Sequence, residues 1–122
     1  MNIQEAAEAS GLTVDTIRYY EKSGMLPPVP RDGRGWRRFD AGALEWLRNL
    51  GRLRATGMPM AEMRRFAVLV HTADPAEATA AADRLEILLA HRQRLACRRA
   101  ELDAAETYLT HKIAVYSGKE TS

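Results

Sequence analysis

The feature that most constrains the fold is the stretch after Pro75, which holds no helix-breaking residue until Gly118. The motif Asp74-Pro75-Ala76-Glu77 offers an N-cap, a proline at the first helical position and an acid in the first turn, so a helix is predicted to begin there. It would run for about 43 residues, or roughly 64 Å. Such a helix is longer than the body of the domain that precedes it.

An apolar residue recurs at every seventh position of this helix, and Leu85, Ala105 and Ile113 partly fill a second row. A protruding helix cannot bury this seam within its own chain, so a partner helix must cover it, most simply from a second copy. We therefore predict a homodimer held by a coiled coil. The residues expected to dimerise are Leu88, Leu95, Leu102, Leu109, Ile113 and Tyr116.

Two short helices joined by a tight turn are predicted at the N-terminus. The segment 2–5 resembles a capping box, and Gly11 stops the first helix. Thr13 is a good N-cap for a second helix over 14–23, which Gly24 ends. This arrangement is typical of a helix-turn-helix.

The second helix has two faces. Val14, Ile17 and Tyr20 recur at intervals of three and form the side expected to be buried. At about 100° per residue, other side chains point the opposite way. The displayed residues are Asp15, Arg18, Tyr19 and Lys22, with Thr16 at the edge of the same face. Arginine can form bidentate hydrogen bonds to guanine or phosphate, and tyrosine can donate its hydroxyl to a phosphate.

The next segment, LPPVPRDGRGWRRFD, is too rich in proline for a helix. Asp32-Gly33 marks a turn between two short extended pieces, 29–31 and 36–39, so a small hairpin is predicted. Its tip and returning strand carry Arg31, Arg34, Arg37 and Arg38.

Two further helices should follow this hairpin. Asp40 caps the third, which runs to about Thr56, and Pro59 opens the fourth. Methionines at helical spacing are far more often core than soft-metal ligands, and the three histidines lie on different turns, so no metal site is predicted. The expected inward residues are Leu44, Leu47, Leu50 and Leu53 on the third helix, and Met60, Met63, Phe66, Ala67 and Val70 on the fourth.

Charge and composition narrow the class of protein. The net charge is only +2, but residues 31–54 hold seven arginines against three acids, which favours a polyanionic partner. The single cysteine, Cys97, excludes an internal disulfide framework and suits a cytoplasmic protein. No apolar run approaches a membrane span and no signal peptide opens the chain. No nucleophile–base pair, phosphate loop or carboxylate pair is found, so neither an enzyme nor a cofactor is expected.

Four segments together resemble the MerR family of bacterial transcription regulators: GLTVDTIRYYEKSGMLPP, GWRRFD, LRATGMPM and HKIAVYSGK. The resemblance covers essentially the whole chain. It implies a mostly α fold with a winged helix-turn-helix over 1–73, a dimerisation helix over 74–118 that forms an antiparallel coiled coil, and a flexible tail over 119–122.

The resemblance also implies a function and the residues that serve it. Such proteins bind a palindromic operator in promoter DNA and distort it so that RNA polymerase can engage, some under the control of a small-molecule effector. The positions that match the DNA-contacting motifs are Thr16, Arg18, Tyr19, Lys22, Arg34, Trp36, Arg37 and Arg38.

Some positions depart from the family pattern. In the wing, the usual Gly-Tyr-Arg-x-Tyr becomes Gly35-Trp36-Arg37-Arg38-Phe39, which loses one hydroxyl. Metal-responding relatives carry cysteines near the end of the long helix, and none follows Cys97. Multidrug-binding relatives add a large C-terminal domain, which this chain is expected to lack. Its length is nearest to an aldehyde-responsive, thiol-based subgroup, whose cysteine aligns with Arg52, so the thiol switch is missing at its expected position. Cys97 is a single helical thiol with no basic cluster aimed at it, and it is not expected to act as a switch.

Two alternatives come from other classes. The chain could be a coiled-coil interaction module whose N-terminal fold binds protein, or an effector-free architectural factor that bends DNA. Salt-dependent binding to duplex DNA separates the first alternative from a regulator, because phosphate neutralisation makes affinity fall with salt. Activation of transcription at a promoter separates the second alternative from a regulator.

Overall fold

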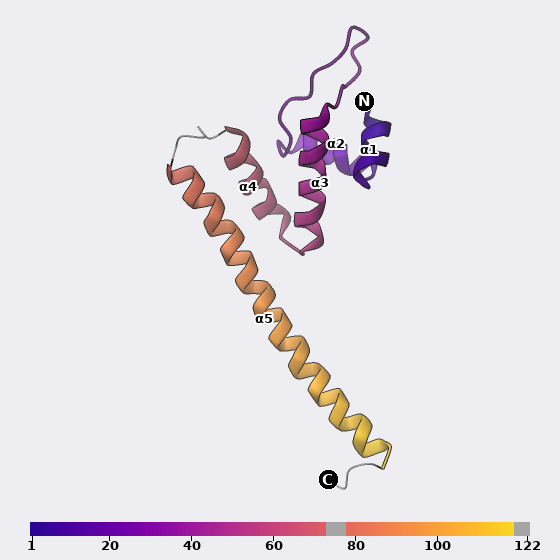
Figure 1. Cartoon of the computed structure of the whole chain (residues 1–122), viewed down its shortest axis with the longest axis vertical. Helices are drawn as coiled ribbons and strands as arrows, with labels where there is room; N and C mark the ends of the chain where they lie inside the picture. Colours follow the sequence, from indigo (N-terminus) through magenta and orange to yellow (C-terminus); the bar gives the residue numbers. More distant parts are fainter. Residues whose placement is uncertain (73–77, 119–122) are drawn as a thin grey trace. The chain divides into compact units, whose positions relative to one another are not determined.

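The computed structural model describes residues 1–72 and 78–118, and within these it contains five helices and no β-strand (Figure 1). The predicted mostly α fold class is thus confirmed. The predicted helix start at 74–77 and the tail at 119–122 lie outside the described residues. The helices are α1 Ile3–Ser10, α2 Val14–Lys22, α3 Ala41–Ala55, α4 Met60–Thr72 and α5 Ala78–Tyr116.

Local capping sets the first three helices, as the sequence predicts. The Asn2 side chain accepts a hydrogen bond from the Glu5 backbone N–H at 2.8 Å, and the Glu5 carboxylate accepts one from the Asn2 N–H at 3.0 Å. Thr13 caps α2 and Asp40 caps α3 with a single bond each, in which the side chain accepts from the backbone N–H three residues ahead. Each cap satisfies an N–H that the helix itself cannot pair, and typically contributes about 1 kcal/mol.

Glycine ends α1 and closes the turn after α2. Gly11 and Gly24 have φ angles of 77° and 76°, a left-handed conformation that other residues adopt only with strain. The chain therefore reverses sharply between α1 and α2, which gives the predicted helix-turn-helix. The two helices contact each other, and α1 also contacts α3.

The segment between α2 and α3 forms a wing, which we define as residues 29–39, and Figure 1 shows it as a loop that projects beyond the start of α3. The two-stranded hairpin predicted at 29–31 and 36–39 is reduced to one antiparallel bridge between Arg31 and Arg37. The Arg38 N–H donates to the Pro30 carbonyl and the Asp32 N–H to the Trp36 carbonyl, each at 2.8 Å. A longer ladder does not form because the prolines have no N–H to donate.

One hydrophobic core joins the elements of the first unit, Met1–Ile87. Val14, Leu44 and Val70, which the sequence predicts to face inward, are only partly buried and lie outside the core cluster. Phe39 lies at the root of the wing and is 1% exposed, so its lack of a hydroxyl suits its position. The methionines at 58 and 63 are core residues, as predicted. The largest fully buried side chains are Ile17, Tyr20, Met25, Phe39, Leu47, Leu50 and Met63.

The helix α5 begins in the first unit, where Ile87 belongs to the core, and continues through the second unit, Leu88–Ser122. Its 39 described residues end just before Gly118, as the sequence predicts. None of the described helices is long and apolar enough to cross a membrane.

Candidate nucleic-acid interface

The displayed face of α2 is built as the sequence predicts. Arg18 and Tyr19 stand exposed while Ile17 and Tyr20, on the other side of the helix, are buried. The Arg18 guanidinium lies 4.0 Å from the Asp15 carboxylate, and the two side chains are 58% and 97% exposed. A loose, exposed ion pair of this kind is worth little, so Arg18 can exchange it for another anion at almost no cost.

Thr16 and Lys22 lie at the two ends of this face. Lys22 is exposed in the last turn of α2. Thr16 is only partly exposed, and its hydroxyl oxygen accepts a hydrogen bond from the Thr13 hydroxyl at 2.8 Å. Thr16 is therefore partly engaged in capping its own helix.

A third element, α4, reaches this surface, which sequence reasoning did not anticipate. Arg64 on α4 donates a hydrogen bond to the Tyr19 hydroxyl at 3.5 Å. The two residues are 45 positions apart, and no local pattern links them. This contact is long and exposed, and it leaves the hydroxyl proton of Tyr19 able to bond an acceptor outside the protein.

A groove of about 260 Å³ joins α2 to the wing. Four guanidinium-bearing residues line it, together with Asn2, Ile3, Gly35 and Trp36. Trp36 is 63% exposed, so its ring faces solvent at the groove. The arginines are Arg18 from α2 and Arg31, Arg34 and Arg37 from the wing. The sequence placed these cations on two separate elements, and the structure gathers them around one hollow suited to an anion.

Arg37 differs from the other wing arginines because it has a strong partner. Its Nε donates to the Glu21 carboxylate at 2.6 Å, and the two side chains are only 26% and 23% exposed. The contact ties the wing to the last turn of α2, across 16 residues of sequence. Sequence reasoning missed this pair and expected Arg37 to be displayed like its neighbours.

The Glu21–Arg37 pair should stabilise the fold measurably. Glu21→Ala leaves a partly buried guanidinium without its partner, and we expect a loss of about 1–2 kcal/mol in the free energy of unfolding by urea. The exposed pair Glu45–Arg48, whose charged atoms lie 3.9 Å apart, is the matched control. Glu45→Ala should cost about 0.5 kcal/mol or less. Equal losses in the two variants would show that the wing is not held by this contact.

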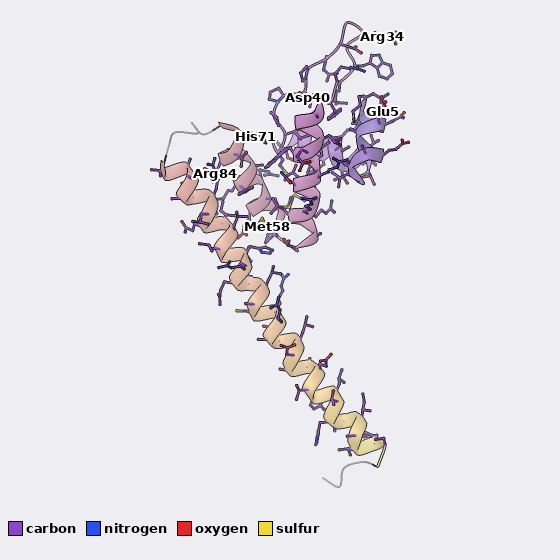
Figure 2. The ribbon with its side chains drawn as sticks, viewed as in Figure 1. Glu5, Arg34, Asp40, Met58, His71 and Arg84 are labelled. Atoms are coloured by element: carbon purple, nitrogen blue, oxygen red, sulfur yellow. The ribbon has the colours of Figure 1, made fainter. Side chains whose placement is uncertain are left out.

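Arg34 and Arg38 occupy different places on the wing. Arg34 lies at the tip, where the Asp32 carboxylate accepts a hydrogen bond from its backbone N–H at 2.9 Å, and Figure 2 labels it there, at the far end of the loop from Asp40. Arg38 is exposed but does not line the groove with Arg18. The structure therefore brings Arg34 and Arg37 close to the displayed face of α2 and sets Arg38 apart.

The second unit carries the apolar seam that the sequence predicts. Leu102 is 70% exposed, and Leu109, Ile113 and Tyr116 are also largely exposed. Leu88 is exposed to a lesser degree and Leu95 is partly buried. Large apolar side chains in a row on a helix are costly to leave in water, at about 25 cal/mol per Å². Cys97 lies on the same helix and is an exposed free thiol.

Two family descriptions match the chain. The MerR HTH family regulatory protein description matches residues 1–67, and the description "MerR, DNA binding" matches residues 44–112. An uncharacterised HTH-type transcriptional regulator of Haemophilus influenzae is 36% identical over 92% of this chain and 80% of its own length. The regulator AdhR of Bacillus subtilis is also 36% identical, over 78% of this chain and 65% of its own length.

Solved structures agree with the sequence matches. A MerR family transcriptional regulator from Listeria monocytogenes superimposes with a TM-score of 0.82 at 32% identity, over 96% of this chain and 86% of the other. HiNmlR, described as a MerR family regulator lacking the sensor domain and bound to promoter DNA, gives a TM-score of 0.76 at 34% identity, over 96% and 90%. The helix-turn-helix, the wing and the long last helix, together with these matches, place this chain in the MerR family of helix-turn-helix transcriptional regulators.

Proposed function

We propose that this protein binds a palindromic operator in promoter DNA as a homodimer and distorts that DNA to control transcription by RNA polymerase. Proteins of its family are regulators rather than enzymes. The observation that carries the proposal is the groove in which Arg18 of α2 meets three arginines of the wing. A protein that binds a phosphate backbone needs such a concentration of cations, whereas a module that binds another protein does not.

The displayed face of α2 fits the major groove. A single helix with Arg18 and Tyr19 exposed can bring one guanidinium to a base edge and one hydroxyl to a phosphate. The wing then supplies further cations, with Trp36 exposed beside them. Phosphate contacts of this kind fix the register of the protein, and the base contact from α2 reads the sequence. Thr16 and Lys22 extend the same face.

Dimerisation through α5 completes the site. One helix-turn-helix reads one half-site, and two-fold dimers place their recognition helices about 34–36 Å apart or at a multiple of that distance. We assign residues 1–73 to DNA binding, 74–118 to dimerisation and 119–122 to a tail. The exposure of Leu102, Leu109 and Ile113 in the single chain supports a partner helix on that seam.

The wing offers the sharpest test of DNA binding. Arg34→Ala together with Arg38→Ala removes two exposed cations that are expected to meet phosphates, so the slope of log K against log salt should flatten by about 0.9 for each phosphate that the variant no longer neutralises. The affinity for specific and for non-specific DNA should fall about equally. The measurement is a binding titration on operator and random duplexes at several salt concentrations.

The matched control removes the same charge elsewhere. Arg98 and Arg99 are adjacent, exposed residues on α5 that flank the apolar seam. Their double alanine variant, once light scattering establishes that it is still a dimer, should keep the wild-type salt slope. A wing variant whose slope is unchanged would show that the wing does not touch the DNA backbone. A protein with no salt-dependent duplex binding at all would favour the protein-interaction alternative.

A further inference from the structure

A second hollow, of about 270 Å³, lies where the wing joins α3 and α4. Its wall is formed by the prolines that lead from α2 into the wing, by the start of α3 and by His71 on α4. Pro27, Pro28 and Pro30 hold the chain in a fixed conformation, since each ring locks one backbone torsion. The hollow is thus largely pre-formed, as binding sites for small molecules usually are.

One polar group in this wall has no partner among the described residues. The Nε2 atom of His71 is buried and makes no hydrogen bond to any of them. The His71 ring also hydrogen-bonds to the Met25 backbone carbonyl, which accepts a second hydrogen bond from Trp46 Nε1 at 2.7 Å. We assign the contact with Met25 to Nδ1–H, because Nε2 makes no hydrogen bond to the described residues.

The protonation state of His71 fixes what this atom can do. Burial lowers the pKa of His71, and this effect outweighs the hydrogen bond to Met25, which favours the charged ring. The ring is therefore neutral at pH 7. With the proton assigned to Nδ1, Nε2 presents a lone pair and accepts a hydrogen bond. A buried acceptor without a donor is costly, so a molecule that brings a donor gains free energy there.

The other residues of the wall determine the polarity, charge and size of the rest of the ligand. Trp46 packs edge-on against His71, with ring centroids 4.7 Å apart, and the prolines present apolar surface. Arg38 and Asp40 both line the hollow, so their charges offset and favour a neutral molecule. A cavity of about 150 Å³ is known to hold benzene, whereas drug-sized ligands need roughly 300–1,000 Å³. A volume of about 270 Å³ suits one ring with a small substituent.

We propose that this hollow binds a small, neutral aromatic alcohol of the phenol class, whose hydroxyl donates a hydrogen bond to Nε2 of His71 and whose ring packs on Trp46 and the prolines. The site is distinct from the arginine groove and requires no DNA. Its walls include both ends of the wing, so an occupant touches the segments that hold the wing in place.

Titration of the full chain with phenol and, separately, with anisole tests this proposal. Anisole is the methyl ether of phenol and has the same ring without a hydroxyl proton. Phenol should shift the indole N–H signal of Trp46 and the ring nitrogen signals of His71 saturably in the NMR spectrum. Anisole should bind about tenfold more weakly, the worth of one hydrogen bond to a buried acceptor. The indole signal of the exposed Trp36 serves as an internal control and should not move.

Two variants and one control locate the site. His71→Phe keeps a ring but removes the acceptor, so the preference for phenol over anisole should disappear. Ala43→Leu, in the wall of the hollow, should abolish binding of both compounds, whereas Ala55→Leu, exposed at the end of the same helix, should not. Circular dichroism tests whether each variant is folded. If Ala43→Leu does not fold, the comparison of phenol with anisole on wild type and on His71→Phe tests the proposal.

Three outcomes would overturn the proposal. One is a phenol response that does not saturate, or that moves Trp36 as much as Trp46. Another is anisole binding as tightly as phenol, which would mean that Nε2 accepts nothing. The third is an unchanged preference for phenol in His71→Phe.

Discussion

Leu102→Asp should convert the protein into a monomer. Leu102 lies in the middle of the apolar seam of α5, and in the single chain it is 70% exposed. In a two-fold dimer both copies would carry the new carboxylate into the seam, and burying unpaired charge costs several kcal/mol. We therefore expect light scattering to give the mass of one chain, at concentrations where the wild type gives two.

A control on the opposite side of α5 separates dimerisation from helix stability. Ala104 is exposed and lies two residues from Leu102, about 200° around the helix. Ala104→Asp introduces the same charge and a similar loss of helix propensity, and it should remain dimeric. If Ala104→Asp dissociates as readily as Leu102→Asp, the effect comes from charge or helix loss and not from the seam.

Arg18→Ala should weaken operator binding by about 1–3 kcal/mol, which is roughly 5- to 150-fold in affinity, if the guanidinium contacts a base. The fold should not change, because within the described part of the chain Arg18 forms only the loose ion pair with Asp15. Gel-shift titration measures the affinity, and far-UV circular dichroism measures the helicity.

Asp15→Ala is the control for this variant. It removes the acid of the same loose pair, and with it a negative charge from the displayed face, so operator affinity should stay the same or rise. Wild-type affinity in Arg18→Ala would remove that residue from the interface.

The sequence predicted the helices well because their signals are local. Asn2, Thr13 and Asp40 each bond to a backbone N–H three residues ahead, so the chain order alone reveals them. The buried stripe of α2 follows from helical periodicity, and Ile17 and Tyr20 are buried as expected. The family resemblance is confirmed, and the sequence alone revealed it because its motifs are contiguous.

What the sequence could not supply are contacts between distant residues. Glu21 and Arg37 are 16 positions apart, and Tyr19 and Arg64 are 45 apart, so neither pair follows from a local pattern. The hairpin predicted from the sequence is longer than the observed one. The turn at Asp32-Gly33 forms as predicted, but the prolines before it cannot supply the N–H donors that would extend the ladder. The site residues named from the sequence stay predictions until DNA binding is measured.

The hollow beside His71 also depends on tertiary structure. His71 lies on α4, and the Met25 carbonyl that it shares with Trp46 belongs to the segment after α2. From the sequence, the three histidines only argued against a metal site. No periodicity would have placed a lone imidazole next to three prolines.

The most direct test of the account is a binding titration on full and half operators, taken from the promoter beside the gene for this protein. Wild type should bind the full inverted repeat as two chains, and more tightly than a half-site by a factor of at least about 100, since the second half-site binds almost intramolecularly. Leu102→Asp should bind both DNAs equally weakly. A Leu102→Asp monomer that still binds the full operator as tightly as wild type, or a wild type that binds full and half operators equally, would contradict the account.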